Sequence, residues 1–247
     1  MTFYLTMLLY VSACSFLAGM GWRIFKWLRT PVPLKIVLTP APKTKLGVSR
    51  RLAGEIFGFR SLFQADRVLW TQAWLFHVSL LLLLVGHIGG LVVPEFARGL
   101  LGMDLVQFHR FAQITGGAAG LLAIFSLLSL LIRRQVVERL RWISTLGDYF
   151  ALLLLLLIIA TGNQMRAGEH FDLTAARQFV AGCLTFHPLA VKSGLLFAIH
   201  VCLVCALLIY IPFSKLVHLG GATLFSPTLN QLNNPREHRH IHESATT

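Results

Sequence analysis

Four histidines lie in or beside long apolar runs, where an imidazole side chain needs a chemical reason to be present. His77 and His87 are ten residues apart in the run WLFHVSLLLLLVGHIGG, and His200 and His218 are eighteen apart around the last apolar run. A polar group inside a membrane segment is costly and usually functional. Imidazole nitrogens are common axial ligands of haem iron. For any one of these histidines, the alternative is a core residue that hydrogen-bonds a backbone carbonyl.

The four histidines pair by depth if the two runs that carry them are antiparallel helices. His87 then matches His200, and His77 matches His218. Two pairs at two depths suit two bis-histidine b-type haems stacked across a membrane. In a helix, His77 and His87 are ~15 Å apart along the axis, and His200 and His218 share one face but are ~27 Å apart. We expect helix tilt and a bend at Pro212 to absorb this difference.

The composition predicts the elements that must position these side chains. The chain has 247 residues, 55% of them hydrophobic and only 13% charged, which is typical of an integral membrane protein. Continuous apolar runs exclude barrel strands, which alternate in hydropathy. We therefore expect an all-α integral membrane protein with a bundle of five transmembrane helices. The runs long enough to cross a bilayer are 3–22, 70–93, 111–132, 147–165 and 190–213.

The net charge of +12 is concentrated in alternate connections between these runs. Most lysines and arginines fall in 23–69, in the connection after the third run and in the C-terminal part. The positive-inside rule then places the N-terminus outside and the C-terminus in the cytoplasm. This distribution argues against a nucleic-acid partner. The alternative interpretation is a docking surface for an acidic partner or anionic lipid. We expect a multi-pass protein of the bacterial inner (cytoplasmic) membrane.

The runs and connections divide the chain into four predicted regions. Residues 1–22 form the first transmembrane helix. Residues 23–69 form a cytoplasmic proline-rich arm followed by an amphipathic helix on the membrane surface, at VSRRLAGEIFGFRSLF. Residues 70–220 form a four-helix dihaem cytochrome b core. Residues 221–247 form a cytoplasmic tail, and its HRHIHE segment is expected to be a solvated end.

Small residues accompany the histidines and suggest close approach of a flat ligand or another helix. Gly86, Gly89 and Gly90 flank His87, where they would admit a macrocycle. Another glycine set in the third run, at 116, 117 and 120, fits ordinary small-residue helix packing equally well. The CxxC of Cys202 and Cys205 lies within an apolar run, so we interpret both cysteines as packing residues.

The motifs around the histidines resemble a known family. LFH followed by VGH, TGGAAG opening the third run, LTFHP, and IPFSKLVH closing the fifth are similar to the gamma subunit family of respiratory nitrate reductase, a membrane cytochrome b. The resemblance covers about 70–220 and implies that His77, His87, His200 and His218 ligate haem. It also implies a quinol site at the outer haem, near Gly86 and His87.

The sequence departs from this family in two places. Where the family has a basic quinol-site lysine, this chain reads Gln107, Phe108, His109 and Arg110, so we expect His109 or Arg110 to take its place. The proline-rich arm instead resembles that of the DsrM subunits of the sulfite-reductase-associated Dsr complex, which are similar to the nitrate reductase subunit and to the cytochrome b of heterodisulfide reductase.

This second resemblance implies a dihaem electron-transfer subunit of a membrane quinone oxidoreductase complex in dissimilatory sulfur metabolism. Its expected partners are the quinone pool, a cytoplasmic iron–sulfur subunit, other subunits of the redox complex and the lipid bilayer. One alternative is the quinol-oxidising gamma subunit of a respiratory nitrate reductase. Alternatives of another class are a proton-relaying transporter and a membrane anchor without haem. A transporter would need intramembrane acids, and the runs offer little beyond Asp148 at the edge of the fourth.

Overall fold

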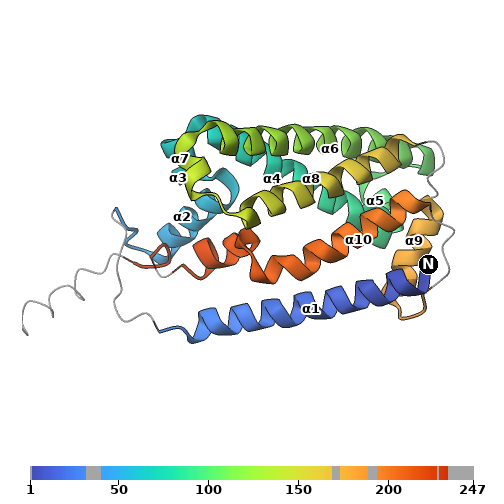
Figure 1. The fold of residues 1–247 in the computed structure, drawn as a ribbon, viewed down its shortest axis with the longest axis horizontal. Coiled ribbons are helices and arrows are strands. Elements are labelled where there is room, and N and C mark those ends of the chain that lie inside the picture. Colours follow the sequence, from blue (N-terminus) through green and yellow to red (C-terminus); the bar gives the residue numbers. More distant parts are fainter. Residues whose placement is uncertain (1, 32–39, 169–172, 189–193, 227, 233–247) are drawn as a thin grey trace, which may run out of the picture. The chain divides into compact units, whose positions relative to one another are not determined.

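The structure is a computed structural model that describes residues 2–31, 40–168, 173–188, 194–226 and 228–232. Within these ranges every regular element is a helix (Figure 1), which confirms the all-α prediction. The proline-rich stretch 32–39, His170 and the HRHIHE tail lie outside the described residues. The α-helices are α1 Thr2–Arg29, α2 Lys45–Gly58, α3 Arg60–Ala65, α4 Arg67–His87, α5 Pro94–Leu101, α6 Leu105–Val136, α7 Glu138–Ile143, α8 Leu146–Ala167, α9 Leu173–Leu184 and α10 Leu195–Tyr210. Shorter π or 3-10 turns are η1 Ile88–Val92, η2 Ile211–Phe213, η3 Lys215–Val217 and η4 Leu219–Leu224.

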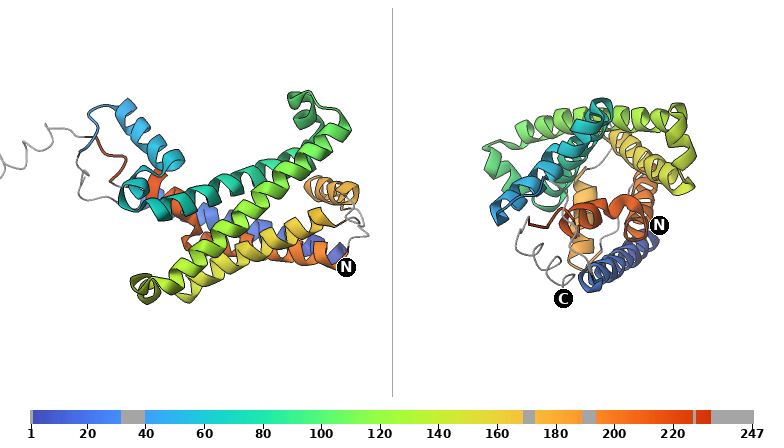
Figure 2. Two further views of the ribbon diagram at one scale, coloured as in Figure 1. Left: turned by 90° about the horizontal axis from the view of Figure 1, so that it is seen from above. Right: turned by 90° about the vertical axis from the view of Figure 1, so that its left-hand side faces the viewer.

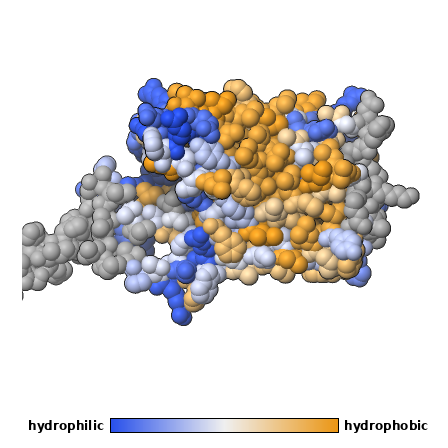
Figure 3. All heavy atoms as spheres, viewed as in Figure 1, coloured by the Kyte–Doolittle hydropathy of each residue, from blue (hydrophilic) through white to orange (hydrophobic). Residues whose placement is uncertain are grey.

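Five helical segments are long and apolar enough to cross a membrane, as the sequence predicted. Many of the large apolar side chains on them are exposed, as expected when lipid is the solvent. On the face drawn in Figure 3, hydrophobic residues cover much of α6, α8 and α10, and hydrophilic residues gather toward the helix ends. The five segments are Thr2–Arg29, Arg67–Val92, Leu105–Val136, Leu146–Ala167 and Leu195–Phe213.

The third span begins earlier than its hydropathy indicated. The Asp104 side chain accepts a hydrogen bond from the backbone N–H of Gln107 at 2.8 Å, and the Gln107 side chain accepts one from the N–H of Asp104 at 3.1 Å. This capping box satisfies two amide groups at the helix terminus and starts α6 at Leu105. His109 and Arg110 therefore lie on the first turns of a helix instead of preceding it.

The segment between the first two spans contains the helical turns expected there, but they form two helices. The Thr44 hydroxyl caps α2 by accepting from the N–H of Gly47 at 3.1 Å. Phe59 then adopts a left-handed conformation with φ of 48°, which ends α2 before α3 begins. The cytoplasmic placement of this segment stays a prediction.

The described chain forms two compact units. The first contains the chain up to Gly19 together with Val68–Ser214, and the second contains Met20–Arg67 together with the residues from Lys215 onward. In the first unit, α8 packs against both α6 and α10. The short helix α7 lies at the turn that joins α6 to α8 (Figure 1), and Figure 2 gives two further views of the same arrangement.

A helix that the sequence did not predict completes one end of the first unit. Helix α9 packs on η1, and its buried residues Ala176, Phe179 and Cys183 form a core with α1 and α10. The hydroxyl of Tyr10 in α1 donates to the carbonyl of Cys183 at 3.0 Å. This end of the unit is therefore held by apolar packing and by a hydrogen bond between α1 and α9.

The second unit is built around Trp27 at the end of α1. Its ring stacks on Phe225 with centroids 5.2 Å apart. A Cβ atom at Gly220 would lie 2.6 Å from this ring, so glycine is needed for the approach. Helix α2 packs against η4 in the same unit. The segment that follows His218 is thus held by residues from before the second span.

Candidate functional site

His87 and His200 come together in the first unit. His87 is the last residue of α4 and His200 lies in α10. The two imidazoles lie within the range of a charge–charge interaction, and no hydrogen bond joins them in the described chain. Two neighbouring imidazoles from different helices are the donor set that a bis-histidine haem requires. Both members of the pair that depth matching predicted thus belong to one unit, and their pairing at a haem stays a prediction.

A threonine that the sequence analysis missed orients His200. The Thr161 hydroxyl lies 2.9 Å from Nδ1 of His200 and 2.8 Å from the carbonyl oxygen of Leu157. Because the carbonyl can only accept, the hydroxyl donates to it and accepts from the Nδ1–H of His200. The remaining nitrogen, Nε2, then carries the lone pair that can bind a metal. Gly162 makes room for this ring, since a Cβ there would lie 3.2 Å from Cε1 of His200.

The histidines of α4 are oriented by their own helix. Nδ1 of His77 lies 2.7 Å from the carbonyl oxygen of Ala73, and Nδ1 of His87 lies 2.7 Å from that of Leu83. A backbone carbonyl in this position fixes the proton on Nδ1 and leaves Nε2 as the basic nitrogen, as is usual for metal-bound histidines. Both residues thus have the tautomer that the predicted role needs.

His218 has the same local arrangement in the second unit. It follows η3, and its Nδ1 lies 3.2 Å from the carbonyl oxygen of Lys215. His77 belongs to the first unit and His218 to the second, so their pairing stays a prediction. The segment around His218 is positioned by the Trp27 contacts described above, which lie outside the predicted four-helix core.

The two sets of glycines have different surroundings. At Gly86 and Gly90, a Cβ would meet no atom within 4 Å, so there is open space beside His87. On α6, a Cβ at Gly120 would lie 2.6 Å from the side chain of Asn163, and one at Gly116 would lie 2.5 Å from that of Arg166. The α6 glycines therefore serve packing against α8, which was the alternative interpretation of that set.

The helix that carries His87 continues as a π turn held by an arginine. Nε of Arg177, on α9, donates to the carbonyl of Gly90 in η1 at 2.7 Å. π turns leave backbone groups without their α-helical partners and often occur at functional sites. Neither α9 nor Arg177 was singled out by the sequence.

His109 and Arg110, the expected quinone donors, are exposed on the first turns of α6. Among the described residues, neither side chain makes a hydrogen bond or ion pair with another side chain. Both remain accessible to a ligand. No hydrogen bond or ion pair between described side chains links them to His87 or His200, so the quinone role stays a prediction.

Asp148, the one acid considered for a proton relay, has a structural role. Its carboxylate accepts from the backbone N–H of Thr145 at 2.9 Å and caps α8. It also lies 3.9 Å from the guanidinium of Arg134. An acid used in this way at a helix terminus gives little support to the transporter alternative. Cys202 and Cys205 are free thiols, and in the described parts of the chain no three His, Cys, Asp or Glu side chains gather as a metal cluster.

The five apolar helices define the chain as a multi-pass helical membrane protein with histidines on two of its spans. A model of the nitrate reductase gamma subunit family matches residues 47–228, and the chain belongs to this family. The cytochrome b-like subunit of an Hdr-like menaquinol oxidoreductase from Archaeoglobus fulgidus is 34% identical, over 94% of this chain and 80% of its own length. Its namesake from Archaeoglobus profundus is 31% identical over the same shares. The nitrate reductase gamma chain of Bacillus subtilis is 31% identical, over 61% of this chain and 71% of its own length.

Proposed function

We propose that this chain is a dihaem cytochrome b subunit that exchanges electrons between membrane quinone and an iron–sulfur partner. The observation that carries the proposal is the pair His87 and His200. The two rings lie within the range of a charge–charge interaction, and each has its Nδ1 beside a hydrogen-bond acceptor. This combination keeps both Nε2 atoms available for one iron.

The second pair would be His77 and His218. Each has Nδ1 beside a backbone carbonyl, as His87 does. On helix α4, His77 is ~15 Å from His87 along the axis. Bound b-type haems supply reversible one-electron transfer. The histidines of this chain would hold them at two depths, and the apolar helices would keep the electron path dry.

Quinone would react at the site of His87 and His200. The open space at Gly86 and Gly90 gives a flat ring room to approach His87. A quinol that is oxidised there gives up two electrons and two protons. The electrons pass one at a time toward the iron–sulfur partner. His109 or Arg110 would hydrogen-bond a quinone oxygen. A charged donor such as a protonated His109 or Arg110 makes such a bond stronger than a neutral pair would.

The relatives favour one kind of complex over another. The two subunits of Hdr-like menaquinol oxidoreductases align with 94% of this chain, and the Bacillus subtilis nitrate reductase chain aligns with 61%. The longer match supports a subunit of a menaquinol-linked oxidoreductase complex, with menaquinol as the electron donor or product and with further subunits as partners. The DsrM-like role in dissimilatory sulfur metabolism is proposed from the resemblance of the proline-rich arm. The alternative is the gamma subunit of a nitrate reductase.

The proposed orientation has the N-terminus outside and the C-terminus in the cytoplasm of a bacterial inner membrane. The end of α6 carries Arg133 and Arg134, and Arg139 and Arg141 follow in α7. Basic residues beside a span favour the cytoplasmic side. The iron–sulfur partner would dock on this side, near His77 and His218.

Visible spectroscopy of the purified full-length chain tests the proposal. We expect a dithionite-reduced minus oxidised spectrum with b-type α-bands, and we expect a menaquinol analogue to produce part of the same signal. The control variant His187→Ala should give the wild-type spectrum, since His187 is exposed and pairs with no other histidine in the proposal. A chain without b-type absorption would contradict the proposal and favour the anchor or transporter alternative.

A further inference from the structure

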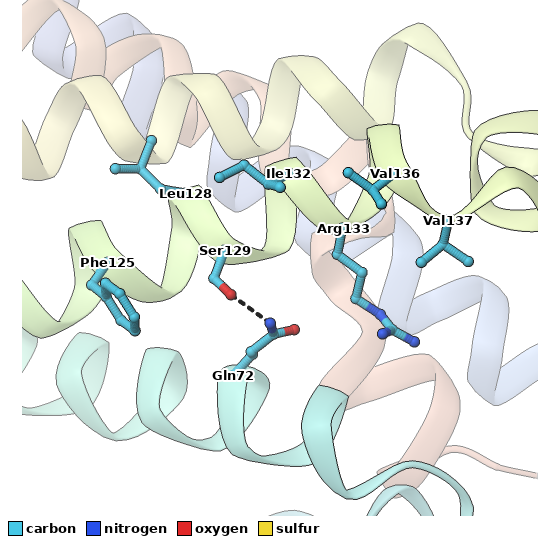
Figure 4. Close-up of a pocket in the computed structure, with 8 residues that line it drawn as sticks. All are labelled: Gln72, Phe125, Leu128, Ser129, Ile132, Arg133, Val136 and Val137. Carbon is cyan, nitrogen blue, oxygen red and sulfur yellow. Dashed lines mark hydrogen bonds between the residues drawn. The ribbon is translucent and has the colours of Figure 1, made fainter.

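A groove of about 480 Å³ lies between α4 and the last turns of α6, within the first unit. Its walls are almost entirely apolar and include Phe125, Leu128, Ile132 and Val136 of α6. Figure 4 shows these side chains along α6, with Gln72 opposite on α4. The stretch from Phe125 to Val136 spans ~16 Å of helix, which is the scale of an extended alkyl chain.

The groove contains a buried polar atom that has no partner in the described chain. The amide nitrogen of Gln72 donates to the hydroxyl of Ser129 (Figure 4). The other atom of that amide, Oε1, is buried and accepts no hydrogen bond from the described residues. A buried acceptor of this kind costs free energy until a donor reaches it. A molecule that enters the groove can supply this donor.

A positive charge lies in the same groove. Arg133 of α6 extends into the space between α6 and α4, where Gln72 also lies (Figure 4). The neighbouring Arg134 is turned to Ser144, to which it donates at 2.8 Å, and to Asp148. The groove thus offers a guanidinium, an amide oxygen and a long apolar wall. These three features call for an anion, a hydroxyl donor and an alkyl chain.

We propose that this groove is a specific site for an anionic phospholipid whose headgroup carries hydroxyls, such as phosphatidylglycerol. One acyl chain lies along α6 between Phe125 and Val136. The phosphate binds the Arg133 guanidinium, and a glycerol hydroxyl donates to Oε1 of Gln72. A quinol would also offer a hydroxyl to Gln72, but it offers no anion to Arg133. A bilayer supplies phospholipid at high local concentration, and basic residues near the membrane surface attract its anionic species.

The site has a structural consequence for its surroundings. Gln72 precedes Ala73, whose carbonyl oxygen lies 2.7 Å from Nδ1 of His77. A lipid that fills the space between α4 and α6 would therefore hold the helix turn that orients this histidine. The proposal does not depend on haem or quinone, because it rests on Gln72, Ser129, Arg133 and the apolar wall.

Native mass spectrometry of the full-length chain in mild detergent tests the site. The chain is incubated with equal amounts of phosphatidylglycerol and phosphatidylcholine that have the same acyl chains. We expect the wild-type chain to retain phosphatidylglycerol preferentially. Arg133→Gln should weaken its retention about tenfold, as expected for one charge-assisted contact. The matched control Arg141→Gln, at an exposed position of α7, should retain it as the wild type does.

A second pair of variants tests the apolar wall without a change of charge. Leu128→Trp fills the groove and should expel the lipid. Leu121→Trp makes the same change at an exposed position of α6 outside the groove and should not. Circular dichroism and gel filtration show which variants are folded, and only folded variants are scored.

Two outcomes overturn the proposal. The first is that Arg133→Gln and Leu128→Trp retain phosphatidylglycerol as the wild type does, or that both control variants lose as much of it as these two variants do. Either result would indicate general electrostatic attraction of the lipid. The second is displacement of the lipid by a short-chain menaquinone at stoichiometric concentration, which would assign the groove to quinone. Selective loss in Arg133→Gln and Leu128→Trp, with no displacement by menaquinone, supports the lipid site.

Discussion

The two proposed haem sites differ in how the chain builds them. His87 and His200 lie in one compact unit, and His200 is oriented by Thr161 of a third helix. His77 and His218 belong to two units, and each has its Nδ1 beside a backbone carbonyl of its own segment. The first site thus depends on packing among spans. The second depends on how the segment after the fifth span is held, which in turn involves Trp27.

The largest expected effect is at the site within one unit. His200→Ala should remove one of two haems, so that a pyridine haemochrome assay finds about half the haem per chain. It should also abolish haem reduction by quinol, because the proposed quinone position is at this site. Rapid reduction of the remaining haem by quinol would place the quinone elsewhere. The site of His87 and His200 would then not be the one that reacts with quinone.

His218→Ala should give the same haem loss with a different consequence. About half the haem should remain, because the two sites share no ligand. Reduction of that remaining haem by quinol should continue, since the site of His87 and His200 is intact. The measurement combines the haemochrome assay with stopped-flow reduction. Unchanged haem content would show that His218 is not a ligand.

Substitution of the expected hydrogen-bond donors to quinone should have a smaller effect. In His109→Ala and Arg110→Ala, loss of a charge-assisted hydrogen bond of ~1–3 kcal/mol should weaken quinone exchange by roughly ten- to a hundredfold. Haem content should not change, because neither residue ligates iron. If both variants reduce haem at the wild-type rate, the quinone site lies near His77 and His218 instead.

The smallest expected effect concerns the orientation of His200. Thr161→Val removes the hydroxyl that accepts from Nδ1 and leaves the backbone carbonyl of Ile158 beside His200, so it should weaken haem retention about tenfold at this site alone. Thr161→Ser should restore it. Thr115→Val is the matched control, because within the described residues the Thr115 hydroxyl donates to the carbonyl of Phe111 in its own helix. Competition with apo-myoglobin measures the retention. Equal haem loss from Thr161→Val and Thr115→Val would mean that Thr161 has no special role.

The spans and the candidate ligands could be predicted because their signals are local. Long apolar runs define the five helices, and four histidines in or beside such runs stand out from their neighbours. Thr161 gives no such signal, since its role depends on the rotation of α8 toward α10. The α6 glycines stayed ambiguous until Asn163 and Arg166 were placed against them.

Residues near the helix ends were also hard to predict. Helix α9 is short and includes polar residues, so hydropathy did not mark it, and its contact with η1 through Arg177 depends on tertiary structure. The early start of α6 follows from the capping box at Asp104, which a hydropathy window does not detect.

The pairing of histidines is the central claim, and paired double variants test it most directly. If His87 and His200 bind the same haem, then His87→Ala/His200→Ala should lose one haem and keep about half the total, whereas His77→Ala/His200→Ala should lose both. The haem-to-protein ratio of the two purified variants decides the matter. Complete loss from the first double variant, or retention of half the haem by the second, would contradict the pairing.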